Sequence, residues 1–297
     1  MKQTVRIGFA AVCLILGSSL IGQAADYEDE PVMSEGSGST VTTYRMSQTV
    51  NLSGLSGLLQ TNSATVMKTG HFVAGASGTF ENSNMPSFKR YTVRGSLTLG
   101  VAPHLEVGVV YPFERLGGIV TARDLEASVK WNFLEQIGDN FPALAVIGTF
   151  IAPTGTDIDR SGSSPTGNAV ATVDKYGFKF LGVASTNVDM RPEDDYIFGL
   201  YAQMGIYFRD LGEPQEEKHG LWGLGGVFPI GPVELILEGD GTIDNGGAAK
   251  ENIARFTSAL RYVVSRVSLT LGYEHTLKQK IGFSDSDGAV AAVSLIF

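Results

Sequence analysis

Apolar and polar residues alternate along most of the chain after residue 64. The pattern is clearest over 90–101, where Tyr91, Val93, Leu97 and Leu99 share one face and charged or hydroxyl side chains share the other. A period of two is typical of a β-strand with one apolar and one polar face. Similar segments recur with turn residues between them, so the pattern predicts an antiparallel β-sheet protein.

Twelve segments carry this pattern, and we expect about 12 strands, within a range of 10 to 14. They cover 65–80, 90–101, 105–114, 123–134, 142–152, 172–186, 196–208, 220–229, 232–241, 253–264, 266–275 and 287–297. An apolar face toward lipid and a polar face toward a lumen are typical of a membrane barrel. The predicted fold is therefore all-β, a transmembrane antiparallel up-and-down β-barrel.

The connections between these segments differ from one side to the other. Short ones at 102–104, 229–232 and about 265 fall on one side, together with the longer 135–141 and 187–195. The opposite side receives connections rich in charge, glycine or serine, at 81–89, 115–122, 153–171, 209–219, 242–252 and 276–286. An outer-membrane barrel with both termini in the periplasm explains this sidedness. A secreted β-sandwich, the alternative, does not.

The N-terminus has the features of a secretory signal. Lys2 and Arg6 start the chain, an apolar run covers Ile7–Ile21, and small residues end it at 22–24. We expect a signal peptide at 1–24, a flexible periplasmic leader or lumen plug at 25–64 and a barrel at 65–297. The expected location is the bacterial outer membrane, after export and cleavage of the signal.

The composition of the chain limits the kinds of partner and cofactor that we expect. Removing the signal removes Cys13, the only cysteine, and leaves 20 basic residues against 31 acidic ones. The mature chain then has no thiol or disulfide, and its acidity argues against nucleic-acid binding. The loop Asp157–Gly162 lacks the regular acid spacing and closing Glu of a calcium loop, so we expect no metal and no cofactor.

The C-terminal strand ends on Phe297, with Leu295 on the same face. In outer-membrane barrels an aromatic residue at this position lies at the membrane interface. Trp131 and Phe133 close another segment on the same side. We expect Trp131, Phe133, Leu295 and Phe297 to anchor the barrel and to serve its assembly. The expected partners are outer-membrane lipid, lipopolysaccharide and the outer-membrane assembly machinery, with the oligomeric state left open.

The polar faces carry both signs of charge. The expected lumen-lining residues are Arg90, Arg94, Glu106, Glu114, Glu126, Lys130, Lys175, Lys179, Glu234, Glu238, Asp240, Arg255, Arg261 and Glu274. Opposite charges on neighbouring strands predict cross-strand pairs, for example between the strand of Arg90 and Arg94 and the strand of Glu106 and Glu114. The near balance of signs argues against strong ion selectivity.

Two interpretations of such a lumen stay open. The charges line a narrow pore for small polar solutes, or they neutralise one another and fill a non-conducting structural barrel. We expect the first, a passive channel. A lipid-modifying enzyme is a remote alternative, because it needs a nucleophile beside a base. None of His71, His104, His219 and His275 is followed by the Ser-Asn-Gly phrase of outer-membrane phospholipase.

Short phrases resemble two barrel families. Phe141-Pro-Ala-Leu-Ala145 running to Ala152-Pro-Thr-Gly155, and Val101–Gly108, resemble transporter-like barrels linked to aromatic-compound degradation. Gly54-Leu-Ser-Gly-Leu-Leu59, with Ala64 and Gly70, is similar to the start of exopolysaccharide-associated barrels, with Asn62 where that pattern has proline. The resemblance implies an outer-membrane barrel that is a channel or an accessory to polysaccharide export or envelope assembly, and it leaves the cargo open.

Overall fold

The computed structural model describes residues 51–84, 87–116, 119–137, 141–155, 176–189, 197–210, 216–230, 232–244, 252–279 and 285–297. The expected signal peptide, residues 25–50 of the expected leader, and the loop 157–162 lie outside these ranges. The described strands belong to one compact unit that spans Thr43–Ile296. In this described part, no helix is long and apolar enough to cross a membrane.

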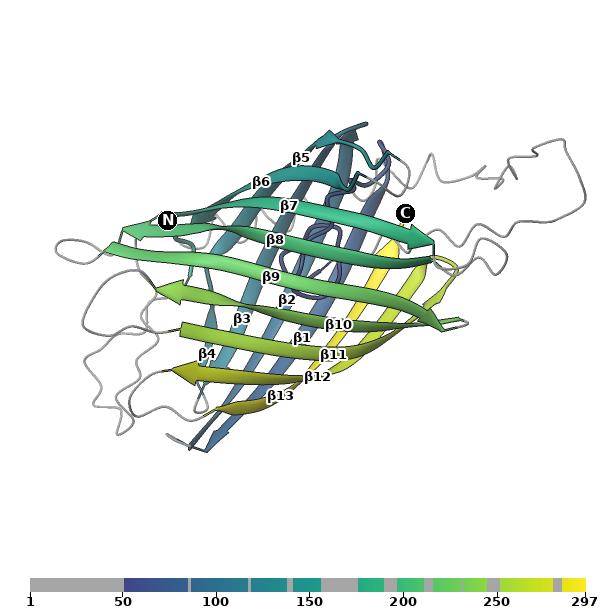
Figure 1. Cartoon of the computed structure of the whole chain (residues 1–297). Coiled ribbons are helices and arrows are strands. Elements are labelled where there is room, and N and C mark those ends of the chain that lie inside the picture. Colours follow the sequence, from purple (N-terminus) through teal and green to yellow (C-terminus); the bar gives the residue numbers. More distant parts are fainter. Residues whose placement is uncertain are drawn as a thin grey trace, which may run out of the picture. The chain divides into compact units, whose positions relative to one another are not determined.

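Thirteen strand segments form one antiparallel sheet that curves into a barrel (Figure 1). They are β1 (Phe72–Asn84), β2 (Ser87–Ala102), β3 (Leu105–Leu116), β4 (Ile119–Ala122), β5 (Leu125–Leu134), β6 (Ala143–Ala152), β7 (Gly177–Asp189), β8 (Ile197–Asp210), β9 (Glu216–Ile230), β10 (Val233–Asp244), β11 (Asn252–Val264), β12 (Val267–Gln279) and β13 (Ser286–Ile296).

The barrel closes because β1 pairs with both β2 and β13. β3 pairs with β4 over its last four residues and with β5 over Leu105–Val110, so β4 and β5 are two halves of one interrupted strand. Counted this way, the closed barrel has 12 strands. The predicted all-β antiparallel barrel of about 12 strands is confirmed.

Two expected strands need correction at their ends. The strand expected over 65–80 begins only at Phe72, and the residues just before it, Lys68–Gly70, are exposed. The strand expected over 123–134 is broken at Arg123 and Asp124. Asp124 is buried there, where its carboxylate accepts a hydrogen bond from the backbone N–H of Gly155 and pairs with Arg209.

Several connections that the sequence suggested to be long are largely strand. β1 and β2 remain paired as far as Asn84 and Ser87, inside the expected connection 81–89. β9 likewise begins at Glu216, inside the expected connection 209–219. Charged and glycine-rich residues satisfy their backbone groups through ladder hydrogen bonds even where apolar alternation has ended. Composition alone therefore overestimates the length of these connections.

Burial alternates along the strands in the sense opposite to that of a soluble protein. Leu271 is 69% exposed on the outer face, whereas its neighbour Thr270 is buried on the inner face. Leu97 and Thr98 show the same alternation on β2. An apolar exterior around a polar interior is the pattern expected of strands that face lipid.

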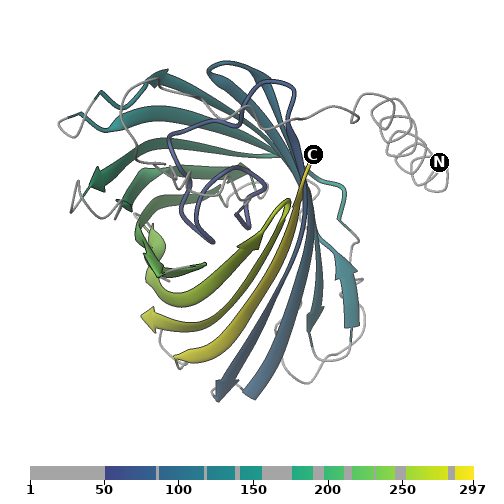
Figure 2. The same ribbon diagram turned by 90° about the vertical axis from the view of Figure 1, so that its right-hand side faces the viewer.

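The segment 51–68, which we call the plug, lies inside the ring of strands (Figure 2). An isolated antiparallel bridge joins Gly57 to Asn62, so the residues between them form a loop at the tip of the plug. Two apolar clusters then join the plug to the barrel wall. They comprise Leu52, Leu58 and Leu59 with Val227, Ile236, Ala259 and Val290, and Leu55 and Ala64 with Ala143, Ala145, Ile147 and Val183. The apolar core of this protein therefore lies within its lumen.

Candidate functional site

An ion pair without solvent access lies where the plug meets β3 and β5. Glu106 and Lys130 are directly opposite in the strand register, and their side chains are 0% exposed. The Lys130 Nζ atom lies 3.1 Å from a carboxylate oxygen of Glu106. A buried pair of this kind is stable only when its remaining hydrogen-bonding capacity is also satisfied.

The plug satisfies that capacity. The Glu106 carboxylate accepts hydrogen bonds from the backbone N–H groups of Ser56 and Met67, each at 2.8 Å. The Lys130 ammonium donates to the carbonyl oxygens of Ser56 (3.3 Å) and Ser63 (3.2 Å), and to the Ser56 hydroxyl. The pair therefore links the wall to both arms of the plug loop.

Glu238 of β10 holds the tip of the plug. Its carboxylate accepts the backbone N–H groups of Leu59 (3.1 Å), Gln60 (3.1 Å) and Thr61 (2.8 Å). Successive N–H groups that point to one place form an anion-binding concavity. The side chain is 5% exposed, so it supplies negative charge to these donors in a nearly dry environment.

Polar side chains from other strands complete the attachment. Thr98, Asn132 and Arg261 donate hydrogen bonds to the backbone carbonyl oxygens of Gly54, Ala64 and Leu58, respectively. Ser185 and Gln203 accept hydrogen bonds from the backbone N–H groups of Ala64 and Asn62, respectively. Glycine allows a closer approach at one point, since a Cβ on Gly108 would lie 2.1 Å from the Gly54 carbonyl oxygen. The wall is thus fitted to the plug backbone.

A band of partly exposed ion pairs lies beyond the plug, toward the side of the longer connections. The pairs are Arg90 with Glu81 and Glu114, Arg123 with Glu114, Lys179 with Glu126, Arg209 with Asp124, and Arg255 with Asp240 and Glu274. Arg90 is 37% exposed and Arg255 is 28% exposed, in contrast to the dry pair beside the plug. These two arginines of the band are therefore more accessible to water than the Glu106–Lys130 pair.

The plug residue Gln60 contacts the band of ion pairs. Its side-chain carbonyl accepts from Arg255 at 3.2 Å, and its amide nitrogen donates to Glu274 at 3.4 Å. The side chain of this plug residue therefore contacts the charged band directly.

The structure brings most of the expected lumen residues together. Arg90, Glu106, Glu114, Glu126, Lys130, Lys179, Glu234, Glu238, Asp240, Arg255, Arg261 and Glu274 all contact an oppositely charged group or the plug. Arg94 also faces inward but has no ion pair among the described residues. Lys175 lies outside the described residues. The expected anchors Trp131, Phe133, Leu295 and Phe297 are exposed.

Sequence reasoning missed several contributors to the site. Glu81 and Arg209 were not recognised, although each continues the inward alternation of its strand. Asp124 was missed because it lies at a strand break. Gln203 was missed because it is uncharged, and its role in holding Asn62 depends on a contact between residues 141 positions apart.

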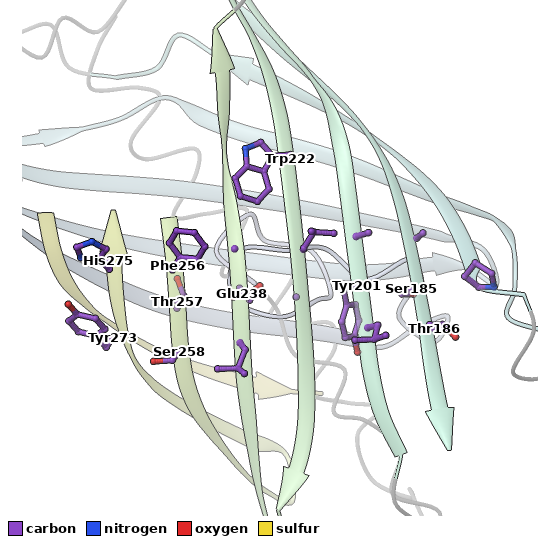
Figure 3. A pocket seen from close by; sticks show the side chains of 18 residues that line it. Ser185, Thr186, Tyr201, Trp222, Glu238, Phe256, Thr257, Ser258, Tyr273 and His275 are labelled. Carbon is purple, nitrogen blue, oxygen red and sulfur yellow. The ribbon is translucent and has the colours of Figure 1, made fainter. Parts of the chain in front are cut away.

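A hollow of about 870 Å³ lies in the wall formed by β7–β12 (Figure 3). Its outward lining is apolar and includes Leu224, Leu237 and Phe256. The rings of Trp222 and Phe256 both lie close to Gly239, since a Cβ there would be in van der Waals contact with each of them. Buried inward-facing residues of the same strands, among them Ser185, Glu238 and Thr257, also line the hollow.

The remote enzyme hypothesis involves His275 on β12. Its Nδ1 atom lies 2.8 Å from a carboxylate oxygen of Asp287, which also accepts a hydrogen bond from the Tyr273 hydroxyl. In the described part of the chain no serine hydroxyl forms a hydrogen bond with this histidine. The set therefore lacks the activated nucleophile that covalent hydrolysis requires.

The fold is that of the outer-membrane β-barrels. An outer-membrane channel from Pseudomonas putida F1 is similar, with a TM-score of 0.63 and 12% identity, over 81% of this chain and 100% of that chain. The translocator domain of the autotransporter NalP from Neisseria meningitidis gives a TM-score of 0.47 and 10% identity, over 76% and 87% of the two chains. The KdgM porin gives a TM-score of 0.47 and 8% identity, over 74% of this chain and 98% of that chain. No protein-family model and no curated protein matches the chain.

Proposed function

We propose that this protein is a passive outer-membrane channel for small polar solutes, whose barrier is the plug. The observation that carries the proposal is the division of the lumen. A band of partly exposed charged groups ends at the plug, which a dry ion pair and other buried polar side chains of the wall hold. Mixed charge on a wet wall favours polar solutes, because such a wall replaces part of their hydration.

The proposed location follows from the surface. The barrel has large apolar residues on its outer face, as strands in lipid require. We extend the proposal to export with a cleaved signal at 1–24, to contact with outer-membrane lipid and lipopolysaccharide, and to assembly through the C-terminal strand. Barrels of the outer membrane share these properties, and the likeness to the Pseudomonas channel supports the fold on which they depend.

A non-conducting structural barrel in polysaccharide export or envelope assembly is the second candidate. The dryness of the Glu106–Lys130 pair favours it, because a permanently fixed plug would fill the lumen. The two candidates differ in a measurable way. A channel produces stepwise ionic current in a planar bilayer, whereas a filled barrel produces none.

We expect the full-length mature protein to give small discrete current steps, and the Gly108→Ala variant to give larger ones. A Cβ at residue 108 would lie 2.1 Å from the Gly54 carbonyl oxygen, a distance that forces the plug away from β3. Single-channel recording of both proteins measures the effect. Gly95→Ala is the control, because a Cβ at residue 95 meets nothing within 4 Å. Absence of steps in both wild type and Gly108→Ala would favour the structural barrel.

A further inference from the structure

Nearly every basic group that faces the lumen is neutralised. Seven described arginine and lysine side chains each contact a carboxylate: Arg90, Arg123, Lys130, Lys179, Arg209, Arg255 and Arg261. Arg94 of β2 is the exception in the described part of the chain. Its Nη1 atom is shielded from solvent and has no hydrogen-bond partner, which is rare for a polar atom in a folded protein.

The strand register explains why Arg94 has no partner. It lies opposite Ser77 on β1 and Pro112 on β3, neither of which is acidic. Glu114 of β3 is opposite Thr92, one inward position away, and contacts Arg90 and Arg123 instead. The chain thus places a guanidinium on the lumen wall and provides it with no carboxylate.

The acids that act on Arg94 from a distance are occupied by other cations. Glu114, Glu126 and Glu274 are near enough to interact with it electrostatically. Lys179 contacts Glu126 at 2.7 Å, and Arg255 lies 3.8 Å from Glu274. Among the described lumen residues, Arg94 is then the cation that contacts no carboxylate. Arg255, which donates to the plug residue Gln60, also interacts electrostatically with Arg94, so the unpaired charge lies near the tip of the plug.

We infer that Arg94 is a binding site for a small monocarboxylate anion that enters the lumen. This inference rests on the proposed channel function and specifies the class of solute. A guanidinium presents two parallel N–H donors that match a carboxylate, and a charge-assisted pair of this kind is stronger than a neutral hydrogen bond. The carboxylates of Glu114, Glu126 and Glu274 also act on this guanidinium and would repel any anion bound there. A single negative charge is therefore accommodated better than the higher charge of phosphate.

Calorimetric titration of the full mature chain in detergent, with acetate as the probe, tests the inference without requiring conduction. We expect saturable binding to the wild type and about fivefold weaker binding to Arg94→Gln, which loses one charge contact with the anion. Arg209→Gln is the matched control, because it makes the same substitution at an arginine whose partner, Asp124, is not one of the three acids that act on Arg94. It should bind acetate as the wild type does, and inorganic phosphate should bind the wild type less tightly.

Three results would overturn the inference: no saturable acetate binding to the wild type, equal weakening in both variants, or tighter binding of phosphate than of acetate. Equal weakening would mean that only the overall charge of the lumen matters. Planar-bilayer current separates this inference from the proposed function. If the wild-type protein conducts but does not bind acetate, the channel function is supported and the Arg94 site is contradicted. If it binds acetate but does not conduct, the site is supported and the channel function is contradicted.

Discussion

Replacing Lys130 with Met is expected to lower the free energy of unfolding by about 3 kcal/mol, within the range measured when one partner of a buried ion pair is removed. Glu106 would then keep its contacts to Ser56 and Met67 but would lie without a counter-charge in a site that is 0% exposed. The carbonyl groups of Ser56 and Ser63 would lose their common donor. Urea unfolding of the purified barrel in detergent, followed by tryptophan fluorescence, measures the loss.

The matched control for this prediction is Lys179→Met. Lys179 and Glu126 are 27% and 24% exposed, so water screens their interaction and its removal should cost less than about 1 kcal/mol. The double variant Lys130→Met/Glu106→Gln should recover part of the loss, because it no longer buries an uncompensated carboxylate. Equal destabilisation by the two lysine substitutions would contradict the special role assigned to the pair beside the plug.

Much of the barrel could be predicted from the alternation alone. A period of two determines which side chains share a face, and lipid outside a polar lumen requires that period of every strand. The segment containing Tyr91 and Leu99 accordingly became β2, extended slightly at both ends. The break at Arg123 and Asp124 was not predictable in this way, because it depends on contacts of Asp124 with Gly155 and Arg209, which are distant in sequence.

The lumen site was predictable only to the level of which residues face inward. Arg90 and Arg94 lie on the same face of the strand expected over 90–101 and carry the same functional group. Both were expected to form ion pairs with acidic residues of the next strand. The register gives partners to Arg90 and none to Arg94. The attachment of the plug was beyond prediction for a similar reason. Leu58 and Leu59 indicate a segment that needs cover, but alternation does not say that Glu238, about 180 residues later, accepts its N–H groups.

Glu238→Ala is expected to release the tip of the plug and to raise single-channel conductance above that of the wild type. Three consecutive N–H groups, of Leu59, Gln60 and Thr61, would lose their acceptor in a nearly dry site. Each unsatisfied buried donor costs about 1–3 kcal/mol, so the tip is expected to move to where water can reach it. Hydrogen–deuterium exchange of these amides should accelerate together with the rise in current.

Glu126→Ala separates the mechanical effect from the electrostatic one. It removes the same single negative charge from the lumen, but Glu126 pairs with Lys179 and makes no hydrogen bond to the plug among the described residues. In the Glu126→Ala variant, amide exchange at Leu59–Thr61 should match that of the wild type. The conductance of this variant should change only as far as lumen charge affects the current. If Glu238→Ala and Glu126→Ala changed current and exchange equally, the hydrogen bonds of Glu238 to the plug would not be the restraint that limits permeation, and the barrier would have to lie elsewhere in the lumen.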